Sequence, residues 1–298
     1  MIEKWRFEWP TWGFLAVTYL VWAIATTWAA VFFLPLGMVL VTLSAAQHSS
    51  LTHEALHGHP TRINWLNELL VFPALSLVVP YKRFRDTHLA HHRDETLTDP
   101  YDDPETNFLD PQVWHTKPEW LKVVLRFNNT LLGRLLIGPM IGQIVFMKRD
   151  WQEIKTGDWQ ILAGWLWHGV ALCPVFWWVV VLGEMPLWAF FLGSYGALSI
   201  LKIRTFLEHR AYEDAPGRCV LIEDRGPLAL IFLNNNLHFV HHSHPNIAWY
   251  DLPARFARER EIFLSRNGGY YFRSYGEVFQ RYFWRAKDPV PHPLFPRH

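Results

Sequence analysis

The chain of 298 residues is half apolar, carries a net charge of +1 and contains 17 Trp and 21 Phe. A mean hydropathy near zero in so apolar a chain indicates long apolar blocks that alternate with polar ones. The near-neutral charge gives no sign of a nucleic-acid partner. Cys173 lies in an apolar run and Cys219 in a polar one, which argues against a disulfide framework or a thiolate metal site.

Four apolar segments follow one another, at residues 12–34, 36–55, 159–182 and 186–207. About 20 apolar residues suffice for a helix to cross a bilayer, and the first segment lacks the cleavage site of a signal peptide. The second carries Gln47, His48 and His53 in its C-terminal half, and polar groups at such depth face a protein interior. We expect one all-α membrane domain over residues 1–298 with four transmembrane helices. The alternative is four buried helices in a large soluble core.

Lysine and arginine are absent from residues 7–61 and 156–201. With four crossings, the regions that do carry them share one side of the membrane, and their basic residues predict that this side is the cytoplasm. We expect both termini there, a cytoplasmic helical cap from residues 56–158 and 208–298, and location in a bacterial inner membrane. Two shorter apolar runs, residues 69–79 and 131–147, are predicted to be helices in the interface or packed beneath the bundle.

Histidines gather in three short motifs with helical spacing. The first places two imidazoles four positions apart, and the other two repeat the spacing His-x-x-His-His. Residues at these intervals lie on one face of a helix. A further histidine follows the fourth predicted span. The candidate metal ligands are His53, His57, His88, His91, His92, His209, His238, His241 and His242.

Nine imidazoles exceed the three or four protein ligands of one zinc site and suit two metal ions of higher coordination number. Imidazole binds iron, copper, nickel and zinc, so ligand type alone leaves the metal open. Two irons are favoured, because an oxygen-activating pair would give the membrane location a purpose.

The order His-x-x-x-His, His-x-x-His-His, His-x-x-His-His, placed after the second span, in the next loop and after the fourth span, resembles the membrane fatty acid desaturase and hydroxylase superfamily over residues 36–250. The resemblance implies two iron ions held by the nine histidines, with His209 as the additional ligand. It implies that Asn234 contacts a metal-bound water or a ligand. It also implies O2 as co-substrate and a lipid or acyl-chain substrate. The chain has no cytochrome or flavin motif, which implies an external electron donor of ferredoxin, rubredoxin or cytochrome type.

Acidic residues near the motifs could accept hydrogen bonds from ligating imidazoles. The candidates are Glu54, Asp86, Asp94, Glu95, Asp99 and Glu208. Other histidines are not assigned as ligands, although they are close to the motifs or within a predicted span; these are His48, His59, His168 and His244.

Fatty acyl desaturation is the reaction that we expect from the resemblance. A hydroxylase or ketolase of a lipid, carotenoid or alkane would use the same site. Outside the enzymes, the alternative is a His-rich metal transporter, which should place its ligands near the bilayer midplane with access from both sides. The motifs lie at helix ends on one predicted side, which argues against a transporter.

Overall fold

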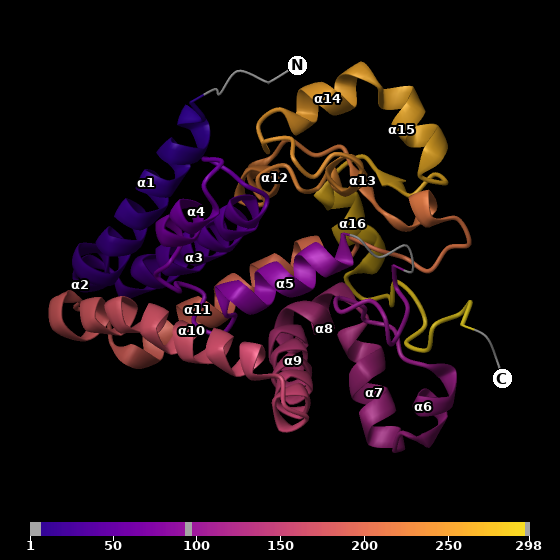
Figure 1. The fold of residues 1–298 in the computed structure, drawn as a ribbon, viewed down its shortest axis with the longest axis horizontal. Helices are drawn as coiled ribbons and strands as arrows, with labels where there is room; N and C mark the ends of the chain where they lie inside the picture. Colours follow the sequence, from indigo (N-terminus) through magenta and orange to yellow (C-terminus); the bar gives the residue numbers. More distant parts are fainter. Residues whose placement is uncertain (1–6, 93–96, 296–298) are drawn as a thin grey trace. The chain divides into compact units, whose positions relative to one another are not determined.

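The computed structural model describes residues 7–92 and 97–295, which are mostly helical (Figure 1). These residues form two compact units. The first comprises the described residues within 7–83, 154–198 and 248–250, and the second comprises those within 84–92, 97–153, 199–247 and 251–295. A boundary between the units falls within each of the helices α5 (Tyr81–His91), α9 (Gly138–Lys155) and α11 (Leu187–Thr205).

The first unit is built from long apolar helices. Helix α1 (Trp9–Ile24) continues through the π-helical turn η1 (Ala25–Ala29) into α2 (Ala30–Phe32), and the extended Phe33 ends this stretch. Helix α3 (Leu34–Leu56) follows at once, with a proline in its first turn, where a missing N–H costs no helical bond. The other elements lying wholly in this unit are α4 (Asn64–Leu70), α10 (Trp159–Trp177) and the π-helical η2 (Trp178–Leu182).

Close packing against α11 fixes the position of α3 in this unit. A Cβ atom added at Gly193 would lie 3.1 Å from the carbonyl oxygen of Met38, and one added at Gly196 would lie 2.7 Å from Thr42 Oγ1. Glycines therefore let the two helices approach closely. The Thr42 hydroxyl also donates to the Gly193 carbonyl at 2.9 Å. The helix held in this way is the one that ends at the first histidine motif.

Within the described residues, two helical stretches are long and apolar enough to cross a membrane, Trp9–Phe32 and Trp159–Leu182. They correspond to the first and third predicted spans. Residues 36–55 and 186–207 also form helices, α3 and α11, but these do not meet the same criterion of length and composition. Polar residues in the second half of α3, and Lys202 and Arg204 in α11, account for the difference. Four crossings are therefore not confirmed.

The two shorter predicted helices differ from expectation. Residues 69–79 are helical only to Leu70, and Pro73 lies in the turns that follow, because proline cannot donate a helical hydrogen bond. Residues 131–147 belong to two helices, α8 (Leu131–Leu136) and α9, separated at Ile137. Pro139 has no N–H for the Leu135 carbonyl, so one continuous helix would leave that carbonyl without its bond.

The second unit surrounds an aromatic core that includes Phe206, Phe232 and Tyr275. Strands β1 (Leu221–Ile222) and β2 (Tyr271–Phe272) form a short parallel pair, which is an exception to the predicted all-helical fold. The helices wholly within this unit are α6 (Pro111–Thr116), α7 (Glu119–Asn128), α8, the 3-10 helix η3 (Ala215–Arg218), α12 (Pro227–Ile231), α13 (His238–Ser243), α14 (Leu252–Arg258), α15 (Arg260–Arg266) and α16 (Tyr275–Tyr282).

The C-terminal segment, residues 287–292, is fastened to other parts of the second unit. The backbone N–H of Lys287 donates to the Asn129 carbonyl at 3.0 Å, and that of His292 donates to the Leu109 carbonyl at 2.8 Å. The Lys287 ammonium donates to the carbonyl of His209. A segment late in the chain thus contacts a candidate metal ligand.

Candidate metal centre

Four of the predicted ligands form one group within the second unit, and this four-histidine group consists of His91, His209, His238 and His242. Each histidine offers a ring nitrogen, and these nitrogen atoms all lie within 4.8 Å of one another. His91 is the last residue of α5, His238 and His242 belong to α13, and His209 follows α11. The interval of four within α13 puts its two imidazoles on one face, as predicted.

The Nδ1 atoms of two histidines in this group face oxygen acceptors. Nδ1 of His91 lies 2.8 Å from Asp103 Oδ1, and Nδ1 of His238 lies 3.1 Å from Asn235 Oδ1. An N–H that donates to an oxygen from Nδ1 leaves the lone pair of a neutral imidazole on Nε2. In these two histidines, the acceptor oxygens favour a proton on Nδ1, which leaves Nε2 as the nitrogen that can bind a metal.

The Nε2 atoms of the group converge. His209 Nε2 lies 2.8 Å from His91 Nε2 and 3.1 Å from His238 Nε2, while His209 Nδ1 lies 3.5 Å from the Cys219 sulfur. Ring nitrogens at such distances share either a proton or a bound cation between them. Nε2 of His242 is buried and, among the described residues, has no hydrogen-bond partner. These contacts fit a bound metal ion.

A second group in the same unit consists of His88, His92 and His241, whose ring nitrogens also lie within 4.8 Å of one another. Nε2 of His92 is 3.0 Å from His88 Nε2 and 3.1 Å from His241 Nε2. His88 Nδ1 lies 2.9 Å from Glu105 Oε1. Three imidazoles can hold a metal ion and leave coordination positions for further ligands.

The first histidine motif lies in the first unit. His53 is in the last turn of α3 and His57 is the residue after the helix, and their ring centroids are 4.8 Å apart. Between them in sequence, Glu54 accepts the backbone N–H of Trp249 at 3.2 Å, and its other oxygen lies 4.0 Å from His53 Nδ1. The predicted acidic partner is therefore near one imidazole but is hydrogen-bonded to backbone.

Carboxylates favour positive charge in the four-histidine group. Burial lowers the pKa of His91, but Glu105 and Asp103 outweigh burial and raise that pKa to about 9. Burial lowers the pKa of the other three histidines well below the usual value, so their imidazoles are neutral. Neutral imidazole is the form that binds a metal ion. Three neutral imidazoles, together with the carboxylates beside His91, suit a cation.

The other predicted polar partners lie in varied surroundings. Glu208 forms an ion pair with Arg204 at 2.9 Å and lies 3.8 Å from His238 Nδ1. Asn234 has a left-handed backbone (φ 56°) in the turn before α13, and it is the next residue, Asn235, that faces His238. The carboxylate of Asp99 accepts backbone N–H groups of its own turn, and that of Asp86 pairs with Arg85. Asp94 and Glu95 lie outside the described residues.

Sequence reasoning missed Asp103 and Glu105, the two carboxylates that contact histidines of the second motif. Both belong to the run Asp-Pro-Tyr-Asp-Asp-Pro-Glu at residues 99–105, shortly after that motif. The density of acids just behind a histidine motif was the available signal, but nothing in the sequence says which of them turn toward the imidazoles.

The histidines that were not assigned as ligands have other partners. His59 Nδ1 lies 2.7 Å from Glu8 Oε1, and His168 Nε2 lies 2.8 Å from the Leu77 carbonyl oxygen. His244 Nε2 lies 3.1 Å from an Arg255 nitrogen. Their exclusion from the ligand set is consistent with these contacts.

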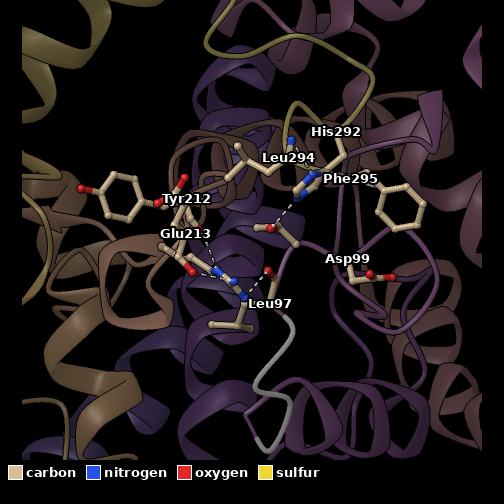
Figure 2. Close-up of a pocket in the computed structure, with 9 residues that line it drawn as sticks. Leu97, Asp99, Tyr212, Glu213, His292, Leu294 and Phe295 are labelled. Atoms are coloured by element: carbon tan, nitrogen blue, oxygen red, sulfur yellow. Dashed lines mark hydrogen bonds between the residues drawn. The ribbon is translucent and has the colours of Figure 1, made fainter. Parts of the chain in front are cut away.

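A cavity of about 400 Å³ lies in the second unit, with Asp99 and His292 on its wall (Figure 2). Thr98 on its wall donates its backbone N–H to Asp103 Oδ2 at 2.8 Å, and the Thr98 hydroxyl lies 3.1 Å from His292 Nε2. Thr98 thus connects the cavity to the carboxylate that holds His91. The cavity is lined by Leu97, Thr98, Asp99, Tyr212, Glu213, Arg218, His292, Leu294 and Phe295.

Comparison with known proteins agrees with this geometry. The family model described as fatty acid desaturase matches residues 26–275, which include all nine predicted ligands. No curated protein matches the chain. The family match covers well over half of the sequence, and the histidine groups fit a metal-dependent oxidoreductase. The chain therefore belongs to the fatty acid desaturase family.

Proposed function

We propose that this protein is an O2-dependent di-iron oxidoreductase that desaturates the acyl chain of a lipid-like substrate. The observation that carries the proposal is the four-histidine group, in which Nδ1 of His91 and of His238 faces an oxygen acceptor and the Nε2 atoms of His91, His209 and His238 converge. This group would bind one iron ion. His88, His92 and His241 would bind the other, completed by His53 and His57. The assignment of the last two follows the order of histidine motifs in the family.

A pair of iron ions, when bound, would supply the reductive O2 activation that is needed to remove hydrogen from an unactivated C–H bond. The residues of the chain prepare the ligands. Asp103 and Glu105 accept from Nδ1 of His91 and His88, which keeps Nε2 of each imidazole available. His91 and Asp103 are both buried, so water does not compete for their hydrogen bond.

A lipid-like substrate is supported by the family and by the two apolar helical stretches, Trp9–Phe32 and Trp159–Leu182. The distribution of lysine and arginine supports a multi-pass protein of a bacterial inner membrane with both termini in the cytoplasm. Electrons would come from a separate ferredoxin, rubredoxin or cytochrome, because the sequence carries no cytochrome or flavin motif of its own.

Metal analysis of the purified protein tests the centre. We expect about two iron ions per chain, unchanged in His244→Ala and reduced in His242→Ala. The two variants form a matched comparison, because His242 lies in α13 and His244 directly follows it. His244 differs in that it contacts an arginine and not the four-histidine group. Stoichiometric zinc with only trace iron would contradict the di-iron proposal.

Mass spectrometry of lipids from cells with and without the protein tests the reaction. Desaturation removes two hydrogen atoms from the product, whereas hydroxylation adds one oxygen atom. A product with one added oxygen, from a protein that contains iron, would replace the desaturase with the hydroxylase or ketolase alternative. A loss of two hydrogens that disappears in His242→Ala and persists in His244→Ala would support desaturation at this centre.

A further inference from the structure

Helix α9 exposes a stripe of four large apolar residues in the second unit. Met140, Ile144, Met147 and Trp151 follow one another at intervals of four, three and four, which places them on one face of the helix. Their exposed fractions are 53%, 58%, 49% and 58%. Large apolar side chains exposed along one helix face mark a surface suited to contact with lipid or with another protein.

The stripe is not the face by which α9 packs on its own unit. The buried residues of α9 are Gly138, Pro139 and Asp150, and a Cβ atom added at Gly142 would lie 3.2 Å from Lys202 Nζ. At about 100° per residue, Gly142 lies opposite the stripe, and Asp150 lies about 90° from the centre of the stripe. The exposed Lys148 lies beside the stripe. α9 thus has a packed face, an apolar exposed face and a basic flank.

The chain itself indicates what covers the stripe. α9 ends at Lys155 and α10 starts at Trp159, so the link can span at most about 14 Å. The stretch that begins at Trp159 is one of the two described stretches that are apolar enough to cross a membrane. If it does cross, Trp159 lies near the membrane surface, and Trp151 is only about two helical turns back along the chain.

We propose that α9 lies in the membrane–water interface, with the stripe inserted among the lipids and Lys148 and Lys155 against anionic headgroups. An interfacial helix with an apolar face and lysines beside it binds anionic bilayers in this manner. This inference goes beyond the reaction and depends on α10 crossing the membrane, not on the metal centre. It names a specific lipid-facing surface outside the candidate spans.

Site-directed fluorescence in reconstituted protein tests the position of the stripe. The full chain with Cys173→Ser is labelled at Ile144→Cys, at Gln152→Cys on another exposed face of α9, or at Leu166→Cys in α10; the remaining Cys219 is buried. In phosphatidylethanolamine–phosphatidylglycerol bilayers, a lipid quencher at headgroup depth should quench the Ile144→Cys label about threefold more than the Gln152→Cys label, and aqueous iodide should show the reverse order.

Three results would overturn the proposal. The first is equal iodide quenching at Ile144→Cys and Gln152→Cys. The second is a disulfide between two Ile144→Cys copies, which would show that a second copy of the chain covers the stripe. The third is exposure of the Leu166→Cys label to iodide, which would show that α10 does not cross the membrane.

The basic flank is tested separately. In Lys148→Gln/Lys155→Gln carrying the Ile144→Cys label, lipid quenching should fall in bilayers that contain phosphatidylglycerol and should be unchanged in neutral phosphatidylcholine bilayers. If lipid quenching is the same in both bilayers and the double substitution does not change it, Lys148 and Lys155 do not contact anionic headgroups.

Discussion

The carboxylate of Asp103 accepts from Nδ1 of His91 at 2.8 Å while the backbone N–H groups of Thr98 and Glu105 hold it, each also at 2.8 Å. Three hydrogen bonds to one buried carboxylate leave it little freedom to rotate. The direction of His91 Nε2, which the metal would contact, is therefore set by a loop distant in sequence from the other ligands of its group.

Replacing Asp103 with asparagine should weaken metal binding. The amide is neutral and offers one acceptor oxygen, so it cannot serve His91 and both backbone donors equally well. Substitutions at carboxylates behind ligating histidines reduce metal affinity by about 10–100-fold. Titration with a chelator and metal analysis measures the loss. Asp99→Asn is the control, because its carboxylate accepts N–H groups of its own turn; an equal loss there would contradict a specific role for Asp103.

Lys287→Met should destabilise the second unit and lower its metal content. The Lys287 side chain is 9% exposed, and its ammonium donates to the His209 carbonyl and pairs with Asp288. Loss of a charged hydrogen bond at a buried position costs about 1.5–3 kcal/mol. Thermal inactivation in detergent measures the change.

Lys287→Arg should recover part of the loss by keeping the charge. Lys122→Met removes an ion pair with Glu119, whose side chain is 76% exposed, and should change stability little. Equal changes in thermal inactivation for Lys122→Met and Lys287→Met would show that the contact of Lys287 with the His209 carbonyl adds nothing to stability.

Glu223 should contribute stability that depends on pH. Hydrogen bonds from Arg260 and Tyr271 lower the pKa of Glu223 below its ordinary value of 4.5. Because the pKa of Glu223 is lower in the folded state, its carboxylate stabilises the fold above pH 4.5. This stabilisation is lost as the pH falls through the folded pKa. The difference in melting temperature between wild type and Glu223→Gln should therefore shrink in acid.

Glu261→Gln is the control for this pH dependence. Its carboxylate also approaches Arg260, at 3.3 Å, but the Glu261 side chain is 88% exposed. We expect a small effect at every pH. A difference in melting temperature between wild type and Glu223→Gln that stays constant from neutral pH into acid would refute the stabilisation by the Glu223 carboxylate.

Gly133→Ala should destabilise the protein although alanine favours helix. An added Cβ atom would lie 1.9 Å from the Phe127 carbonyl oxygen, within the tight turn between α7 and α8. Alanine gains up to about 1 kcal/mol over glycine in an open helix, but overpacking against backbone costs about 1–3 kcal/mol or more. At Gly142 the nearest atom is the flexible end of Lys202, so Gly142→Ala should be nearly neutral in a melting experiment.

The histidines that share a helix face could be predicted because their spacing is local, but the division into two groups could not. The intervals of three and four in α5 and α13 act within one or two helical turns, so the sequence alone indicates which imidazoles share a face. The partners of those imidazoles could not be predicted. Asp103 and Glu105 lie in an irregular loop whose conformation depends on contacts with distant residues such as His292.

The aromatic residues near the C-terminus show the same limit. Phe256, Phe263 and Phe272 lie in a basic stretch rich in Phe and Tyr, a composition found at membrane surfaces as well as in cores, and each is 2% exposed in the second unit. Composition does not distinguish a buried aromatic from one that faces lipid. Apolar length located Trp9–Phe32 and Trp159–Leu182 correctly because it is a property of each segment alone.

The attachment of residues 287–292 has a consequence for the biogenesis of the protein. Ribosomes make the chain from its N-terminus, so every candidate metal ligand is synthesised before Lys287 reaches the His209 carbonyl. During translation the imidazoles of the second unit therefore exist without the contacts of the C-terminal segment. A nascent chain stalled before Lys287 would present the His209 segment without the hydrogen bond that holds its carbonyl.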